Sequence, residues 1–111
     1  MSLADRTCEP CRGGIPPLTP VLIAPLAVQV PAWEVVRHHH LRREFRFPDF
    51  AAALAFVNRI GVEAEAQGHH PDLELAWGRV AVTLWTHKID GLAEADFILA
   101  ARIDRLHAAR A

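Results

Sequence analysis

The segment between Pro48 and Gly68 constrains the fold of this chain most strongly. Its apolar residues recur at helical spacing, and they are Phe50, Leu54, Phe56, Val57, Ile60 and Ala64. Pro48 and Asp49 favour a helix start, and Gly68 is typical of a helix C-terminal stop. A helix with a single apolar stripe buries that stripe against a second layer of structure. The remaining segments must therefore supply that layer.

Two pairs of strand-like segments flank this helix and are suited to form the second layer. Residues 33–37 and 41–47 form the first pair, and apolar and charged side chains alternate along most of the latter segment. Residues 72–76 and 79–86 form the second pair, joined by a tight turn at Trp77 and Gly78. We therefore expect two antiparallel hairpins.

One helix is expected at each end of this arrangement. Thr19 and Pro20 are typical of an N-cap followed by proline at the first helical position, so the first helix should cover about residues 20–30, with Pro25 inside it. Leu99, Ile103 and Leu106 predict a last helix over about residues 94–109. The order is helix, two strands, helix, two strands, helix. It predicts an α+β domain in which three helices pack on one face of a four-stranded antiparallel sheet.

Residues 1–18 lack a periodic pattern and are rich in glycine, proline and cysteine. We assign them to a leader that we expect to be partly flexible and dispensable for activity, and residues 19–111 to one domain. Cys8 and Cys11 form a C-x-x-C pair, which is half of a zinc site or a redox dithiol. The favoured interpretation is a pair of unpaired thiols, and a metal site completed by histidines is the alternative.

Composition limits the classes of partner. Twelve Lys and Arg against 13 Asp and Glu give a net charge of -1, which makes direct nucleic-acid binding unexpected. No run of 18 apolar residues and no signal-peptide pattern occurs, so we expect a soluble, cytoplasmic protein that does not enter membranes. In so small a chain, a hydrophobic share of 51% predicts self-association.

Histidines gather at the ends of the expected elements. His69 and His70 follow the helix stop, and His87 ends the last strand. Histidine can donate or accept a proton near neutrality, and such element ends often carry catalytic groups. Asp96, in the first turn of the last helix, should stay ionised and could fix the tautomer of an imidazole. Pro71 favours an extended His70, which by itself would direct only one of the two adjacent histidines into a given pocket.

Bland interpretations of these residues stay open at this point. A polar loop after a helix and a surface histidine at a strand end would also produce the motif. Three histidines without a pair spaced i, i+4 indicate a metal site only weakly. The triplet at 38–40 falls at a hairpin turn, where we expect a solvated loop.

The spacing of these residues resembles the pterin-4a-carbinolamine dehydratases over about residues 19–106. The shared pattern is an acidic residue, then His-His-Pro, an aromatic residue, Thr-His, Gly-Leu and an aspartate. Its positions in this chain are Glu65, His69, His70, Pro71, Trp77, Thr86, His87, Gly91, Leu92 and Asp96. The WEVV and REFRFPDFAAALAFVNRI segments extend the resemblance.

The resemblance implies a cofactor-free lyase that removes water from a 4a-hydroxytetrahydropterin. It implies that His69, His70 and His87 line the pterin pocket as acid and base, which overrides the inference that only one of the adjacent histidines enters it. By the same resemblance the substrate-binding and orienting residues are Glu65, Pro71, Trp77, Thr86 and Asp96, with no metal. A homodimer or homotetramer is also implied.

Three departures from the family pattern stand out. Ala93 replaces a Thr or Ser, which removes a helix N-cap worth about 1 kcal/mol and could loosen Asp96. Leu73 stands where many relatives have tryptophan, and Trp85 replaces a smaller polar residue. Trp85 either narrows the pocket or packs against the sheet, and we favour packing. Two other functions stay in play. One is a non-catalytic dimerisation module, as in animal members of the family, and the other is a metal-binding protein using Cys8, Cys11 and histidines.

Overall fold

The computed structural model describes residues 2–8 and 15–109. The three α-helices of these residues are α1 (Pro20–Ala27), α2 (Phe50–Gln67) and α3 (Glu94–Ala109). The strands are β1 (Glu34–Val36), β2 (His40–Arg46), β3 (Asp72–Ala76) and β4 (Arg79–Leu84). Two short 3-10 helices are η1 (Leu3–Asp5) and η2 (His87–Ile89). The order of helices and strands confirms the prediction from the sequence.

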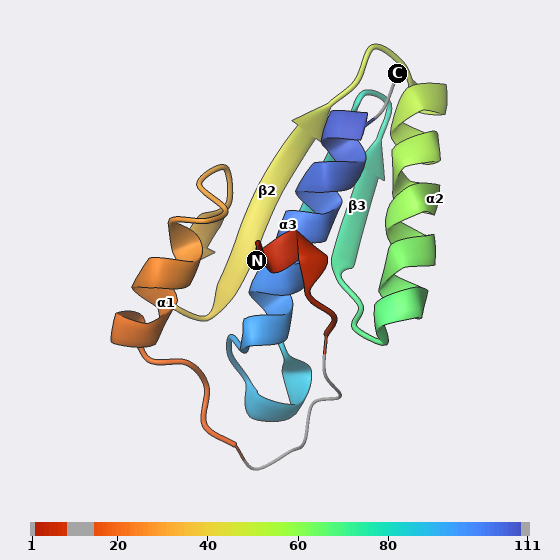
Figure 1. Cartoon of the computed structure of the whole chain (residues 1–111). Coiled ribbons are helices and arrows are strands. Elements are labelled where there is room, and N and C mark those ends of the chain that lie inside the picture. The colour runs from red at the N-terminus through yellow and green to blue at the C-terminus, as the bar shows by residue number, and fades with distance from the viewer. Residues whose placement is uncertain (1, 9–14, 110–111) are drawn as a thin grey trace.

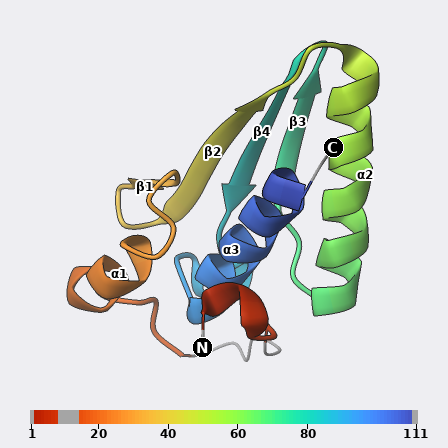
Figure 2. The same ribbon diagram turned by 45° about the horizontal axis from the view of Figure 1, so that its top comes forward.

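The four strands form one antiparallel sheet in the order β1-β2-β4-β3. Each hairpin pairs as expected, and β2 then pairs with β4, so that Phe45 lies opposite Val80. Helices α2 and α3 lie over one face of this sheet, and α1 lies beside its β1 edge (Figures 1 and 2). The sheet and the helical layer confirm the predicted α+β class.

Local chemistry sets the ends of α2. The carboxylate of Asp49 accepts a hydrogen bond from the Ala52 N–H at 2.8 Å, which caps the first turn. Gly68 follows the last turn in the left-handed conformation, with a φ of 64°. The structure confirms the start and the end that the sequence predicts for this helix.

Four predicted elements have different bounds in the structure, and one of them, β2, begins and ends one residue earlier than expected. Helix α1 ends at Ala27, because the N–H groups of Gln29 and Val30 bond three residues back, which tightens the chain into turns. Strand β4 ends at Leu84, because Thr86 pairs with Gly91 and no longer with β2. Strand β1 covers only Glu34–Val36.

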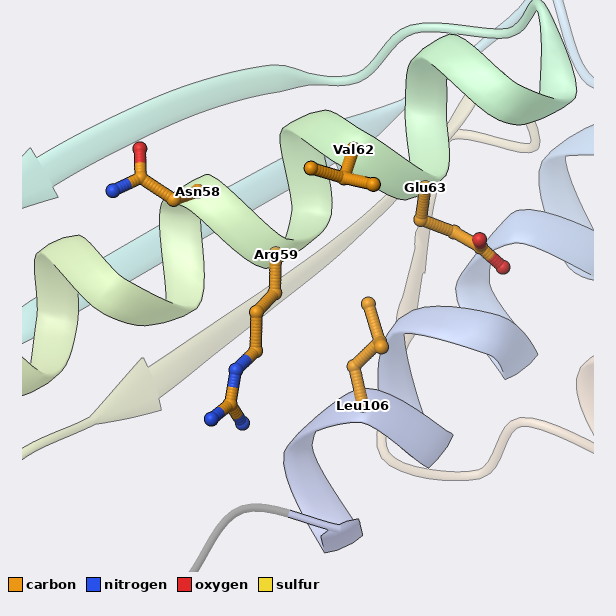
Figure 3. A pocket seen from close by; sticks show the side chains of 5 residues that line it. All are labelled: Asn58, Arg59, Val62, Glu63 and Leu106. Atoms are coloured by element: carbon orange, nitrogen blue, oxygen red, sulfur yellow. The ribbon is translucent and has the colours of Figure 1, made fainter.

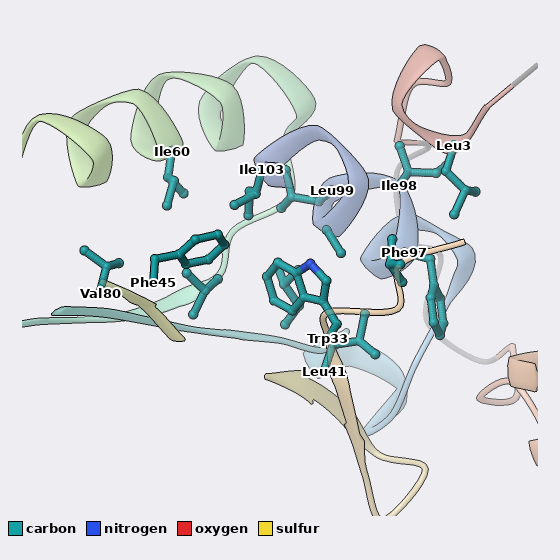
Figure 4. Close-up of a cluster of buried hydrophobic side chains, with 14 of the residues drawn as sticks. Leu3, Trp33, Leu41, Phe45, Ile60, Val80, Phe97, Ile98, Leu99 and Ile103 are labelled. Carbon is teal, nitrogen blue, oxygen red and sulfur yellow. The ribbon is translucent and has the colours of Figure 1, made fainter. Parts of the chain in front are cut away.

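The core lies between the sheet and helices α2 and α3. Figure 4 shows Phe45 and Val80 of the sheet facing Ile60 of α2 and Ile103 of α3, all of them fully buried or nearly so. Trp33 packs edge-on against Phe45 and donates a hydrogen bond from Nε1 to Asp104 at 2.8 Å. Apolar burial on this scale is the main source of fold stability.

Part of the expected leader also packs on this core. Leu3 is buried beside Ile98 of α3 (Figure 4), and Asp5 forms an ion pair with Arg105 at 2.8 Å. Cys8 has a defined place in this packing. Its N–H donates a hydrogen bond to Gln67 Oε1 at 2.9 Å, and its Sγ contacts Ala95 O at 3.5 Å. Residues 2–8 therefore hold a defined place against α2 and α3. Leu3 anchors this segment by burying its side chain in the core. The segment is too short for a periodic pattern to predict that contact.

Candidate active site

Asp96 is the most enclosed polar residue of the candidate site. Its side chain is fully buried near the start of α3. One carboxylate oxygen, Oδ2, accepts hydrogen bonds from Thr86 Oγ1 at 2.7 Å and from the Ala93 N–H at 2.9 Å. The other, Oδ1, lies 2.6 Å from Nε2 of His69. A buried carboxylate held in this way has a fixed position and orientation.

The alanine at 93 does not leave Asp96 loose. In a capping box the side chain at the third helical position reaches back to the N–H of the N-cap residue. Asp96 makes that bond to Ala93, and the Asp96 N–H donates to Ala93 O at 3.1 Å. The Asp96 carboxylate thus accepts the hydrogen bond from the N-cap N–H, and this half of the capping box does not depend on the side chain at position 93.

His69 is the histidine with the best-defined surroundings. It follows Gly68 directly, and its side chain is 13% exposed. A carboxylate can only accept a hydrogen bond, so Nε2 of His69 donates to Asp96. In the neutral ring this leaves the lone pair on Nδ1, and in the charged ring Nδ1 carries a proton. Asp96 therefore selects the tautomer of His69.

His70 turns to a different carboxylate. Its Nε2 contacts Oε2 of Glu65, and both side chains are exposed. Glu65 belongs to the last turn of α2, five residues before His70. The two adjacent histidines are thus directed to separate carboxylates, one buried and one solvated, on the two sides of the chain. Pro71, which follows them, is half-buried.

His87 begins η2, directly after the buried Thr86. Its ring is exposed and stacks on Trp85, with 3.9 Å between centroids and 23° between planes. Because Thr86 also bonds Asp96, the chain that carries His87 is tied to the network that holds His69.

Trp77 lies away from these groups. It is 68% exposed and occupies the turn at the far end of the β3 and β4 hairpin, opposite Asp72. Strand β3 runs for five residues from Asp72 to Ala76 before that turn, which corresponds to about 16 Å. Within one chain, the structure does not bring Trp77 to the histidines. Glycine is required next to Trp77, because a Cβ on Gly78 would lie 2.8 Å from Phe47 O.

Two residues outside the expected site form a chain of ring contacts that ends at His87. Trp85 stacks on His87, and its other ring neighbour is His39, at 4.6 Å between centroids. The triplet at 38–40 is therefore more than a solvated loop, because His39 contacts both Trp85 and Asp90. The sequence signal that could have indicated Trp85 is its position immediately before Thr-His.

A surface depression elsewhere contains none of these residues. It lies between α2 and α3 and is lined by Asn58, Arg59, Val62, Glu63 and Leu106 (Figure 3). Arg102 of α3 bonds Glu63 at its margin at 2.8 Å. The depression belongs to the helical layer, whereas the candidate site lies where α2 ends and α3 begins.

The described residues give no geometric support to the alternative of a metal-binding protein. Among residues 2–8 and 15–109, no three His, Cys, Asp or Glu side chains are grouped as a metal site. Burial raises the pKa of the Cys8 thiol to about 11, so it is protonated at neutral pH. Cys11 lies outside the described residues.

No helix in the described part of the chain has the length and apolar character needed to cross a membrane.

Comparisons with known proteins agree on one family. The family model for pterin 4 alpha carbinolamine dehydratase matches residues 16–106. A relative from Rubrobacter xylanophilus is 58% identical over 104 residues, which cover 94% of this chain and 97% of the relative. A relative from Alkaliphilus metalliredigens is 50% identical over 105 residues, covering 94% and 95%. Both are named, provisionally, pterin-4-alpha-carbinolamine dehydratase.

Two solved structures are similar in fold. A protein from Brucella melitensis, described as a transcriptional coactivator/pterin dehydratase, matches with a TM-score of 0.76 and 31% identity, covering 81% of this chain and 97% of that chain. A pterin dehydratase-like protein, described as a RuBisCO assembly factor in the alpha-carboxysome, matches with a TM-score of 0.60 and 26% identity, covering 71% and 93%. The fold thus occurs in proteins whose descriptions include roles other than catalysis.

Proposed function

Because this chain belongs to the pterin 4 alpha carbinolamine dehydratase family, we propose that it removes water from a 4a-hydroxytetrahydropterin to give the quinonoid dihydropterin. The single observation that carries the proposal is the pairing of His69 with the buried Asp96. A purely structural module has no need of a nearly buried imidazole whose tautomer is fixed by a carboxylate. His70 and His87 complete the histidine set.

The reaction requires two proton transfers. The C4a–O bond breaks as a protonated acid gives its proton to the leaving hydroxyl, which departs as water. A base takes the proton from N5, and the N5–H electron pair forms the C4a–N5 double bond. One histidine therefore has to be charged and another neutral at the start, and proton exchange with solvent restores both.

The three histidines are suited to different parts of this task. His69 carries the partner that stabilises an imidazolium, because the Asp96 carboxylate lies 2.6 Å from its Nε2. His70 and His87 are exposed, so they can exchange protons with water. Glu65 orients His70, while Thr86 and Pro71 hold the segments that carry the histidines. Trp77 has no place in this scheme within one chain.

We also propose that the protein is a homo-oligomer that works with no added metal or nucleotide. Exposed apolar side chains on α1 and α2 support self-association, and they are Val21, Leu22, Phe50, Leu54 and Val62. Light scattering that gives only the 12.3 kDa mass of one chain would contradict the oligomer. An interaction role, as in the two solved relatives, is the second candidate and rests on the same exposed side chains.

Stopped-flow absorbance of 4a-hydroxytetrahydropterin decay tests the proposed activity. We expect the full chain to accelerate the decay, because imidazoles can supply both proton transfers. The rate should be unchanged after chelation, whereas activity that disappears with a chelator and returns with zinc would favour the metal alternative. A decay rate equal to that of buffer would leave the interaction role as the better proposal.

A further inference from the structure

Three aromatic rings from two segments of the chain form a cluster beside the candidate site, which we call the stack. The indole of Trp85 contacts the imidazoles of both His39 and His87. The ring centroids are 4.6 Å apart on the His39 side and 3.9 Å apart on the His87 side, with interplanar angles of 43° and 23°. His39 comes from the turn between β1 and β2, and His87 begins η2. The stack therefore ties two loops together through Trp85.

His87 depends on this stack for its orientation. Its side chain is exposed, and the described residues provide no hydrogen bond to its imidazole. An exposed side chain that must meet a substrate in one geometry loses reactivity when it is free to rotate. The nearly parallel contact with Trp85 limits that rotation, because the ring would give up its stacking surface on turning away.

Trp85 is itself held from its own edge. Its Nε1 donates to Oδ2 of Asp72, the first residue of β3, at 3.4 Å. It follows β4 directly, so its backbone continues a strand in which Val80, Ala81, Val82 and Leu84 are buried. The half-buried indole already contacts two imidazoles, and His87 stacks on it with 23° between the ring planes. These contacts leave less of the indole surface for a flat pterin ring, so the geometry favours a positioning role over a binding role.

His39 closes the arrangement from the other side. Its Nε2 donates to Oδ1 of Asp90 at 2.8 Å, and its Nδ1 lies 3.0 Å from Nδ1 of His40. Asp90 follows η2 in the left-handed conformation, with a φ of 49°. His39 thus contacts the end of the η2 segment directly and the start of that segment through Trp85.

We propose that Trp85 is a positioning residue for His87, and that His39 supports Trp85 in that role. This inference rests on the proposed dehydratase function, in which His87 is an acid or base. It explains how the ring of His87 is oriented, since no hydrogen bond from the described residues orients it. It also assigns a task to one member of the 38–40 triplet.

A kinetic comparison of Trp85→Leu and Trp85→Phe tests the inference. We expect Trp85→Leu to lower kcat by about tenfold or more with KM changed by less than about twofold, because the substrate itself does not touch the indole. Trp85→Phe keeps an aromatic face and should recover most of the rate. In a His87→Ala background, Trp85→Leu should cost less than about twofold further, because the two residues act as a unit. Equal losses in both backgrounds, or a loss confined to KM, would overturn the positioning role.

His39 has a matched control next to it in the chain. We expect His39→Asn to lower kcat by about threefold to tenfold, because it removes the outer ring of the stack and its bond to Asp90. His38 is exposed and has a φ of 55°, a conformation that asparagine tolerates, so His38→Asn should change kcat by less than about twofold. Equal effects of the two variants would remove His39 from the proposal.

A measurement that needs no activity separates this inference from the proposed function. Stacking on indole shifts the ring protons of His87 upfield in the NMR spectrum of the full-length protein. We expect that shift to disappear in Trp85→Leu and to persist in part in Trp85→Phe. Unchanged His87 resonances in Trp85→Leu would overturn the stack even in an active enzyme. An upfield shift in a protein without dehydratase activity would instead refute the proposed function and leave the stack intact.

Discussion

Replacing Asp96 by asparagine should lower the dehydration rate by about 10²- to 10⁴-fold while the protein stays folded. Asparagine has one acceptor oxygen, and that oxygen can keep the hydrogen bonds from Thr86 and Ala93. Its amide NH2 then faces Nε2 of His69, which must accept and so loses its proton. The proton moves to Nδ1, where the neutral wild-type ring has its lone pair, and the charged ring loses the carboxylate that stabilises it.

Histidine NMR and a matched substitution make this result specific. The nitrogen shifts of His69 should report a proton on Nε2 in the wild type and on Nδ1 in the Asp96 variant. Asp49→Asn is the control, since Asp49 caps α2 and asparagine is an equally good N-cap, so rate and stability should stay near wild type. A wild-type rate in the Asp96 variant, with the tautomer reversed, would remove Asp96 from the mechanism.

Replacing His69 and His87 by alanine tests the division of labour between the histidines. Each single change should lower the rate by about 10²- to 10⁴-fold, because a general acid or base typically contributes that much. The double variant should lose less than the product of the two single losses, because groups that act on one substrate are not additive. Rates from stopped-flow absorbance across a pH series should show a bell-shaped profile in the wild type and lose one limb in each single variant.

The control for the histidine series is His38→Asn. His38 lies in the same turn as His39, and it is not one of the three rings of the stack. The sequence predicts a solvated loop for the whole 38–40 triplet, and the contacts of His39 and His40 leave His38 as the member suited to be a control. Full additivity in the His69 and His87 double variant, together with an unchanged pH profile, would contradict a shared catalytic task.

Local patterns predicted the elements of this fold well. Asp49 and Gly68 mark the ends of α2 because capping and the left-handed conformation depend on one or two residues. The pairing within each hairpin follows from short loops and alternation, which act over a few positions. The packing of residues 2–8 could not be predicted in this way, because the burial of Leu3 depends on its contact with Ile98 of α3 and not on any period in the sequence.

The site divides in the same way. The sequence by itself determined the chemical types, a set of histidines and an aspartate at element ends, because those positions follow from periodicity and turn residues. Only the tertiary structure decided which of them meet. His69 reaches Asp96, 27 residues on, because the end of α2 packs beside the start of α3, and Trp77 is left at the distant turn of the hairpin. His39 reaches Trp85 because β2 pairs with β4, a long-range register that no local pattern encodes.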